Sequence, residues 1–220
     1  MDERSTGLIL RVRPLTETSL IVQWLTPDLG RFATVAKGGR RPKSSFRGKI
    51  DLFFLADFSF ARSRRSDLHT LREVSLLDSL PGLRRDLLLL NQMSYATTLI
   101  EQTTETDTPL FEIFDLMIGF ANRVANHPPQ IVPMLAFEFK LLAALGVNPN
   151  LTERKLSPKA AKLIPMLTTG SWDDLAGVTA DKPELREIYR FLNGFMMFHL
   201  GKIPMGRKNA FAPTVGGLPP

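Results

Sequence analysis

The stretch IDLFFLADFSF, residues Ile50 to Phe60, decides the fold class of the first part of the chain. Apolar side chains occupy every second position, from Ile50 through Ala56 to Phe60. A period of two residues is the spacing of side chains on one face of a β-strand. We therefore predict a strand over residues 50–60 with one fully apolar face.

Four shorter apolar segments lie on either side of this strand, at residues 8–12, 20–25, 32–36 and 68–77. A turn signal, TPDLG at residues 26–30, separates the second segment from the third. Five short strands with turns between them, within about 70 residues, are typical of a small barrel or sandwich. A five-stranded barrel of the OB type fits this size, so residues 1–80 are predicted to form an OB-fold nucleic-acid-binding domain.

After Pro81-Gly82 the apolar spacing changes to that of helices, with stripes over residues 83–100, 110–125 and 131–145. Ser157-Pro158 and the capping-box pattern from Asp181 to Glu184 open two further helices. The expected protein is therefore α+β, with a helical bundle at 81–208 and a flexible, Gly- and Pro-rich tail at 209–220.

Charge is unevenly distributed along the 220 residues, whose net charge is +6. Residues 1–80 hold 14 Lys and Arg against 9 Asp and Glu, which indicates a polyanionic partner for this part. The absence of Cys excludes disulfides, thiolate zinc sites and Cys nucleophiles. Neither a signal peptide nor an apolar run of membrane-spanning length occurs, so a cytoplasmic location is expected.

The most basic segment, VAKGGRRPKSSFRGK at residues 35–49, contains six Lys or Arg and no acidic residue. A solvated loop kept basic for solubility is one interpretation; a phosphate-binding loop between barrel strands is the other. Phe46, in this polar loop, is the best candidate for stacking on a base. The predicted nucleic-acid contacts are Arg11, Arg13, Arg31, Lys37, Arg40, Arg41, Lys43, Phe46, Arg47, Lys49, Arg62, Arg64 and Arg65.

No pattern of catalytic or metal-binding residues is present. The three His residues, His69, His127 and His199, have no second His or acid at ligand spacing. Glu138 lies on an apolar helical stripe, where it is expected to pair with an Arg from a neighbouring helix. No catalytic residue, metal or cofactor is predicted, and an enzyme with a scattered site remains the alternative.

Four segments in order resemble the RecO family of bacterial recombination mediators: GLILRVRPLTETSLIVQWLTPDLGRFATVAKGGRRPKS, LREVSLLDSLPGLRRDL, FEFKLLAALGVNP and FHLGKIPMGRK. The resemblance covers almost the whole chain. Many relatives have a four-Cys zinc site after the helix that ends in Gly-x-x-Pro. This chain has no Cys, so no zinc finger is expected.

The resemblance implies a non-enzymatic, nucleoid-associated DNA repair and recombination protein that binds single- and double-stranded DNA and anneals complementary strands. It also implies contact with RecR and with the acidic C-terminal tail of single-stranded DNA-binding protein, and indirect cooperation with RecA. The partner-binding residues implied are Lys140, Lys202, Arg207 and Lys208. For Lys140, pairing with carboxylates of the bundle is an equal alternative. An RNA- or ribosome-associated OB-fold protein is the rival function.

Overall fold

The computed structural model describes residues 2–147, 156–178 and 180–211. The chain forms two compact units. One comprises Met1–Leu80 and Glu105–Ile118, and the other Pro81–Thr104 and Gly119–Pro220. All five strands lie in the first unit and helices make up most of the second, which confirms the predicted α+β class.

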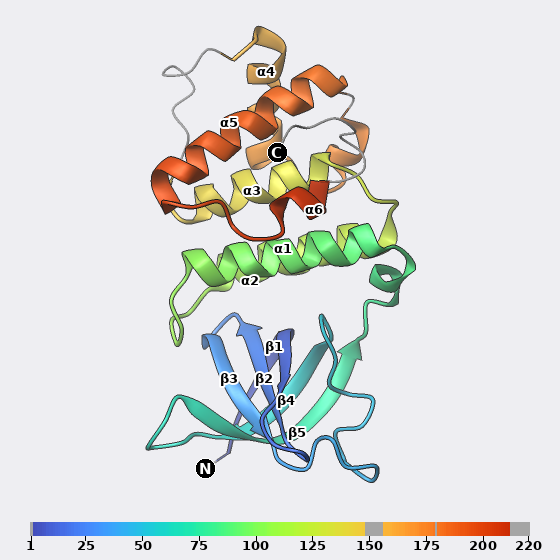
Figure 1. Cartoon of the computed structure of the whole chain (residues 1–220), viewed down its shortest axis with the longest axis vertical. Helices are drawn as coiled ribbons and strands as arrows, with labels where there is room; N and C mark the ends of the chain where they lie inside the picture. The colour runs from blue at the N-terminus through green and yellow to red at the C-terminus, as the bar shows by residue number, and fades with distance from the viewer. Residues whose placement is uncertain (1, 148–155, 179, 212–220) are drawn as a thin grey trace. The chain divides into compact units, whose positions relative to one another are not determined.

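Five strands close into a barrel in the order β1-β2-β3-β5-β4 (Figure 1). Their bounds are β1 Asp2–Pro14, β2 Leu20–Thr26, β3 Gly30–Ala36, β4 Leu55–Ala61 and β5 Leu68–Asp78. Neighbours pair antiparallel except β3 with β5, whose parallel pairing closes the ring. The predicted five-stranded, OB-like barrel is therefore confirmed.

Aromatic rings fill the barrel, because inward positions alternate with outward ones along each strand. Trp24 stacks on Phe58 with ring centroids 4.1 Å apart, and Phe32 packs against Phe60 at 5.0 Å. The indole Nε1 of Trp24 donates to the buried Thr34 hydroxyl at 2.8 Å. The indole buried in the barrel core therefore has its donor satisfied.

The fourth strand is shorter than predicted, because it begins at Leu55 and not at Ile50. Phe53 has a φ of 64°, in the left-handed region, which interrupts an extended backbone. Its amide nevertheless donates to the carbonyl of Ile9 at 2.8 Å, and its side chain is buried. The alternation at 50–54 therefore belongs to a turn that packs on β1.

The segment Glu105–Ile118 joins the barrel unit through the β2–β3 turn. The Leu110 amide donates to the Pro27 carbonyl at 2.9 Å, and the Asp107 amide donates to the Arg31 carbonyl at 3.0 Å. No pattern in the sequence indicates this attachment, since residues 105–109 have neither strand nor helix periodicity.

The helices confirm most of the expected periodicities. Their bounds are η1 Pro81–Arg85, α1 Leu87–Thr103, α2 Phe111–Asn126, α3 Val132–Ala144, α4 Pro158–Thr169, η3 Asp174–Gly177, α5 Lys182–Leu200 and α6 Arg207–Phe211. The Ser157 hydroxyl caps α4 and the Asp181–Glu184 capping box opens α5, as predicted. The helix expected from Leu83 is a 3₁₀ turn followed by α1, which begins after the N-cap Asp86.

The start of the expected tail differs from the structure. Residues 209–211 belong to α6, and both Ala210 and Phe211 are buried. The rest of the expected tail, residues 212–220, lies outside the described residues, as does the segment after the Gly-x-x-Pro helix end, residues 148–155.

Two further findings concern the part of the chain that the structure describes. No helix in it combines the length and apolar character needed to cross a bilayer. No group of three or more His, Cys, Asp or Glu side chains in it is placed to hold a metal ion.

Candidate nucleic-acid interface

Strand register places three of the predicted arginines on one face of the barrel. Arg11 is opposite Gln23, and Arg13 is opposite Ile21. Arg31, on β3, is opposite Leu25. Directly opposed residues share a sheet face, and this face is opposite to that of the buried Trp24–Phe32 pair. Arg11, Arg13 and Arg31 therefore lie on the outer surface of β1–β2–β3.

The basic loop, residues 37–54, starts at one end of this surface and is fastened to the β1–β2 turn. The Arg40 amide donates to the Thr18 carbonyl at 2.9 Å, and its guanidinium donates to the Thr16 carbonyl at 3.1 Å. This anchoring holds the first part of the loop beside the end of β1, where Arg13 is exposed.

Cations on this loop are exposed and largely unneutralised. The exposed members are Lys37, Arg40, Arg41, Lys43, Arg47 and Lys49. Within the described residues none of them forms an ion pair, and the only side-chain hydrogen bonds, from Arg40 and Arg47, go to neutral carbonyls. Their charge is therefore available to an external anion.

The β4–β5 loop carries three arginines, one paired with a carboxylate and two exposed. Arg62 forms two hydrogen bonds to Glu3, at 2.8 and 2.9 Å, and this contact lowers the pKa of the Glu3 carboxyl. Its predicted role as a phosphate contact is weakened, because an internal carboxylate already neutralises it. The side chains of Arg64 and Arg65 are exposed and have no partner among the described residues.

Phe46 is not the stacking residue that the sequence suggested. It is 8% exposed and belongs to the barrel's core cluster with Val22, Trp24 and Phe58. The polar residues around it in sequence concealed this, because burial here results from the loop folding back over the barrel. Phe46 is therefore not the freely exposed ring that was predicted, although it is among the residues that line the groove described next.

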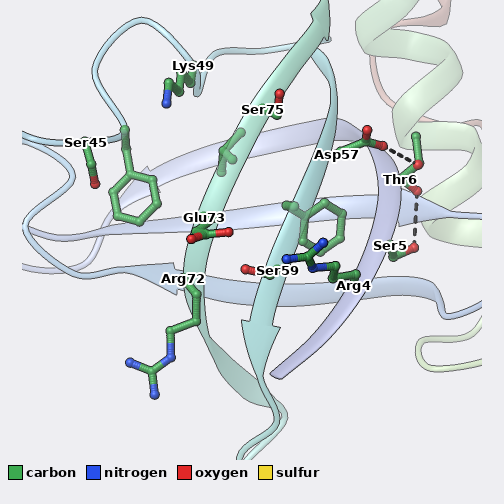
Figure 2. A pocket seen from close by; sticks show the side chains of 13 residues that line it. Arg4, Ser5, Thr6, Ser45, Lys49, Asp57, Ser59, Arg72, Glu73 and Ser75 are labelled. Atoms are coloured by element: carbon green, nitrogen blue, oxygen red, sulfur yellow. Dashed lines mark hydrogen bonds between the residues drawn. The ribbon is translucent and has the colours of Figure 1, made fainter. Parts of the chain in front are cut away.

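A groove on the other side of the barrel was missed by sequence reasoning (Figure 2). It has a volume of about 670 Å³ and lies over β1, β4 and β5, bordered by Ser45 and Lys49 of the basic loop. Arg4 and Arg72 line it, although neither belongs to a basic run. They line one groove because β1 and β5 both pair with β4.

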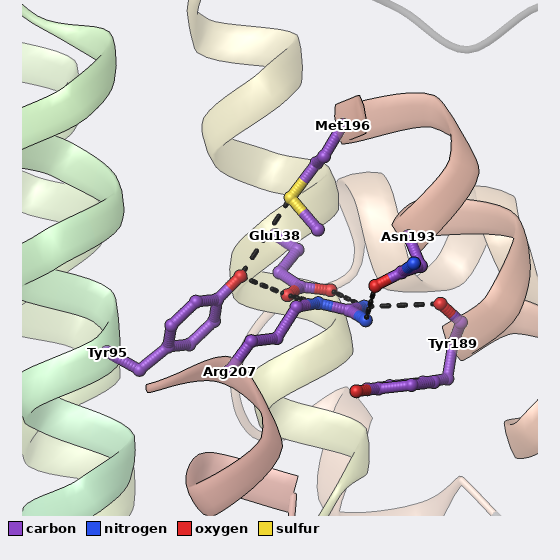
Figure 3. Close-up of polar contacts among 6 residues, drawn as sticks. All are labelled: Tyr95, Glu138, Tyr189, Asn193, Met196 and Arg207. Atoms are coloured by element: carbon purple, nitrogen blue, oxygen red, sulfur yellow. Dashed lines mark hydrogen bonds and ion pairs between the residues drawn. The ribbon is translucent and has the colours of Figure 1, made fainter. Parts of the chain in front are cut away.

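In the helical unit, Arg207 is held by an internal carboxylate rather than available to a partner (Figure 3). It is 1% exposed and forms hydrogen bonds of 2.7 and 2.8 Å to Glu138. Burial by itself lowers the pKa of Arg207, but the carboxylate of Glu138 more than offsets this and raises it. The predicted pairing of Glu138 with an Arg is thus confirmed, and partner binding by Arg207 is wrong.

The other predicted partner residues differ in their surroundings. Lys140 donates to the carbonyls of Thr168 and Gly170 at the end of α4, at 3.2 and 2.5 Å. Its ammonium therefore caps a helix C-terminus, a role that neither interpretation of the sequence contained. Lys202 and Lys208 are exposed.

Comparison with known protein families identifies the family of this chain. A model of the N-terminal part of recombination protein O matches residues 1–80, and a model of its C-terminal part matches residues 84–154. Both matches fall in the order found in that family. The chain belongs to the RecO family.

Curated RecO proteins show the same likeness. The DNA repair protein RecO of Rhodopirellula baltica is 32% identical over 143 residues, 65% of this chain and 53% of that protein. The protein of the same name from Gloeothece citriformis is 32% identical over 157 residues, 70% of this chain and 55% of that protein. The chain thus spans about half the length of the curated RecO proteins it matches.

The RecO matches divide the candidate residues. The barrel, with its basic loop and its groove, lies within the N-terminal match, and Glu138 and Lys140 lie within the C-terminal one. Lys202, Arg207 and Lys208 lie beyond residue 154, where the RecO models do not reach.

Proposed function

We propose that this chain acts in DNA repair and recombination by binding DNA strands on its barrel and annealing them. The observation that carries the proposal is the unneutralised cationic loop, which Arg40 holds against the β1–β2 turn at the end of the outer β1–β2–β3 surface where Arg13 is exposed. Cations in such a position neutralise phosphates and lower the repulsion between two strands. Binding and annealing of this kind need no covalent chemistry, so we propose no enzymatic step.

Salt dependence tests the loop as the phosphate-contacting surface. Arg40→Ala/Arg41→Ala/Lys43→Ala should reduce the slope of log K against log salt by about 2 for single strands, because each phosphate contact contributes about 0.7. The measurement is fluorescence anisotropy of a labelled oligonucleotide over a series of salt concentrations. Arg62→Ala is the matched control, since Glu3 already neutralises that arginine. An unchanged slope in the triple variant would remove the loop from the interface.

Annealing distinguishes this function from an RNA- or ribosome-associated one. The proposal predicts annealing of complementary DNA strands that are coated with single-stranded DNA-binding protein. A protein that bound RNA tightly and failed to anneal such strands would support the RNA-associated function.

The family resemblance also suggests partners, and a cavity in the helical unit supports one of them. It has a volume of about 300 Å³ and is lined by apolar side chains that include Ile131, Leu175 and Leu185, with Lys182 among them. An acidic peptide with an apolar end, such as the tail of single-stranded DNA-binding protein, fits this chemistry. We propose contacts with RecR and, indirectly, RecA on the resemblance alone.

Filling the cavity tests the peptide site. Ala176→Trp should abolish binding of a labelled tail peptide, because Ala176 is an exposed residue of the cavity wall. The double variant Lys202→Ala/Lys208→Ala tests whether the tail peptide binds instead at the surface that carries these two exposed lysines. Loss of binding in the second variant and not in the first would move the site to Lys202 and Lys208.

A further inference from the structure

The groove over β1, β4 and β5 has a regular construction (Figure 2). One row across the three strands consists of Arg4, Ser59 and Glu73, and the next consists of Thr6, Asp57 and Ser75. Opposed residues share a face, so these side chains form one surface, with Lys49 and Ser45 of the basic loop at its border.

Both signs of charge line this groove, which distinguishes it from residues 35–49, where no acidic residue occurs. Arg4, Lys49 and Arg72 contribute cations, and Asp57 and Glu73 contribute carboxylates. A surface that bound only phosphates would gain nothing from carboxylates, because they repel the phosphodiester backbone. The ligand that fits must be anionic and must also donate hydrogen bonds.

Several polar groups of the groove have no partner within the described part of the chain. The hydroxyls of Ser45, Ser59 and Ser75 and the carboxylate of Glu73 make no side-chain hydrogen bond there. Asp57, by contrast, accepts a hydrogen bond from Thr6 at 2.5 Å, which holds it in place. The groove thus offers free acceptors next to Arg4 and Lys49, which form no ion pair among the described residues, whereas Arg72 pairs with Asp2 at 3.7 Å.

We infer that the groove binds unpaired nucleotides of a single strand, with cations on the phosphates and Glu73, Asp57 and the hydroxyls on base edges. Exocyclic and ring N–H groups of bases donate to carboxylates, but in a duplex the Watson–Crick edges are occupied. The volume of about 670 Å³ lies within the usual range of ligand pockets. The inference rests on the proposed function. In it, the groove selects single strands over duplex, and the basic loop binds phosphates of either without selection.

A blocking substitution with a matched control tests this division. Ser75→Phe places a ring in the groove, whereas Leu76→Phe places the same ring on the same strand outside the groove lining. Affinities are measured for a mixed-sequence single strand, an abasic strand with the same number of phosphates, and a duplex. Wild type and Leu76→Phe should prefer the normal strand over the abasic strand by about tenfold, since base contacts add to phosphate contacts.

Ser75→Phe should remove that preference and leave affinity for the abasic strand and the duplex unchanged. Ser45→Trp, on the opposite border, should do the same without altering the sheet, which covers the case in which Ser75→Phe does not fold. If either blocked variant folds and keeps the wild-type preference, the groove inference is overturned and the proposed function stands. If wild type binds none of the three probes, the proposed function itself fails.

Discussion

Replacing Arg207 with Met will lower the free energy of unfolding of the helical unit by about 3–5 kcal/mol, because it leaves Glu138 charged and unpaired in the core. Glu138 is fully buried, and two of its contacts come from Arg207. Its remaining partner among the described residues, the Tyr95 hydroxyl at 2.5 Å, donates one hydrogen bond and no charge. Burial, reinforced by Glu138, raises the pKa of Tyr95, so this hydroxyl stays protonated and continues to donate.

Urea unfolding followed by circular dichroism at the helical band measures this loss. Lys208→Met is the matched control, since Lys208 is the exposed neighbour of Arg207 and its replacement should change stability by no more than about 0.5 kcal/mol. The double variant Glu138→Leu/Arg207→Met should be more stable than Arg207→Met alone, because no buried charge is left unpaired. Equal stability of Arg207→Met and Lys208→Met would show that the buried pair contributes nothing.

The second large effect is expected at Gly30, where the β2–β3 turn meets the segment 105–110. Gly30 has a φ of 67°, and a Cβ at this position would lie 1.8 Å from the Thr108 carbonyl oxygen. Gly30→Ala adds about 1–2 kcal/mol of left-handed strain. It also displaces the segment whose amides bond to Pro27 and Arg31, at about 1 kcal/mol for each hydrogen bond. A total loss of about 3–4 kcal/mol is expected.

Gly48→Ala provides the comparison, because Gly48 has a similar φ of 73° and no atom lies within 4 Å of the place its Cβ would take. It should lose only the strain of about 1–2 kcal/mol. Thermal unfolding followed by tryptophan fluorescence in a Trp172→Phe background, where the buried Trp24 is the remaining tryptophan, reports on the barrel in both variants. If the two variants lose the same stability, the contact with Thr108 has no part in holding the segment 105–110 to the turn.

The wrong site predictions share one physical cause. Phe46 and Arg207 each lie in a polar or basic stretch, and in such a stretch sequence reasoning places side chains in solvent. Both are buried by residues far away in the chain, Phe46 by the barrel core and Arg207 by Glu138. Arg4 and Arg72 represent the converse, because they are unremarkable in sequence and line one groove only because β1 and β5 both pair with β4.

The features that could be predicted from the order of residues are local: the periods of two and 3.6 residues, the caps at Ser157 and Asp181, and the absence of acid from residues 35–49. These follow from backbone geometry and from the residues within a few positions, so they need no tertiary contact. Long-range packing determines which cations remain unpaired and where β4 begins. It also creates the groove of mixed charge on β1, β4 and β5. Each of these depends on which distant side chain occupies the neighbouring strand or helix, and composition and spacing do not specify that.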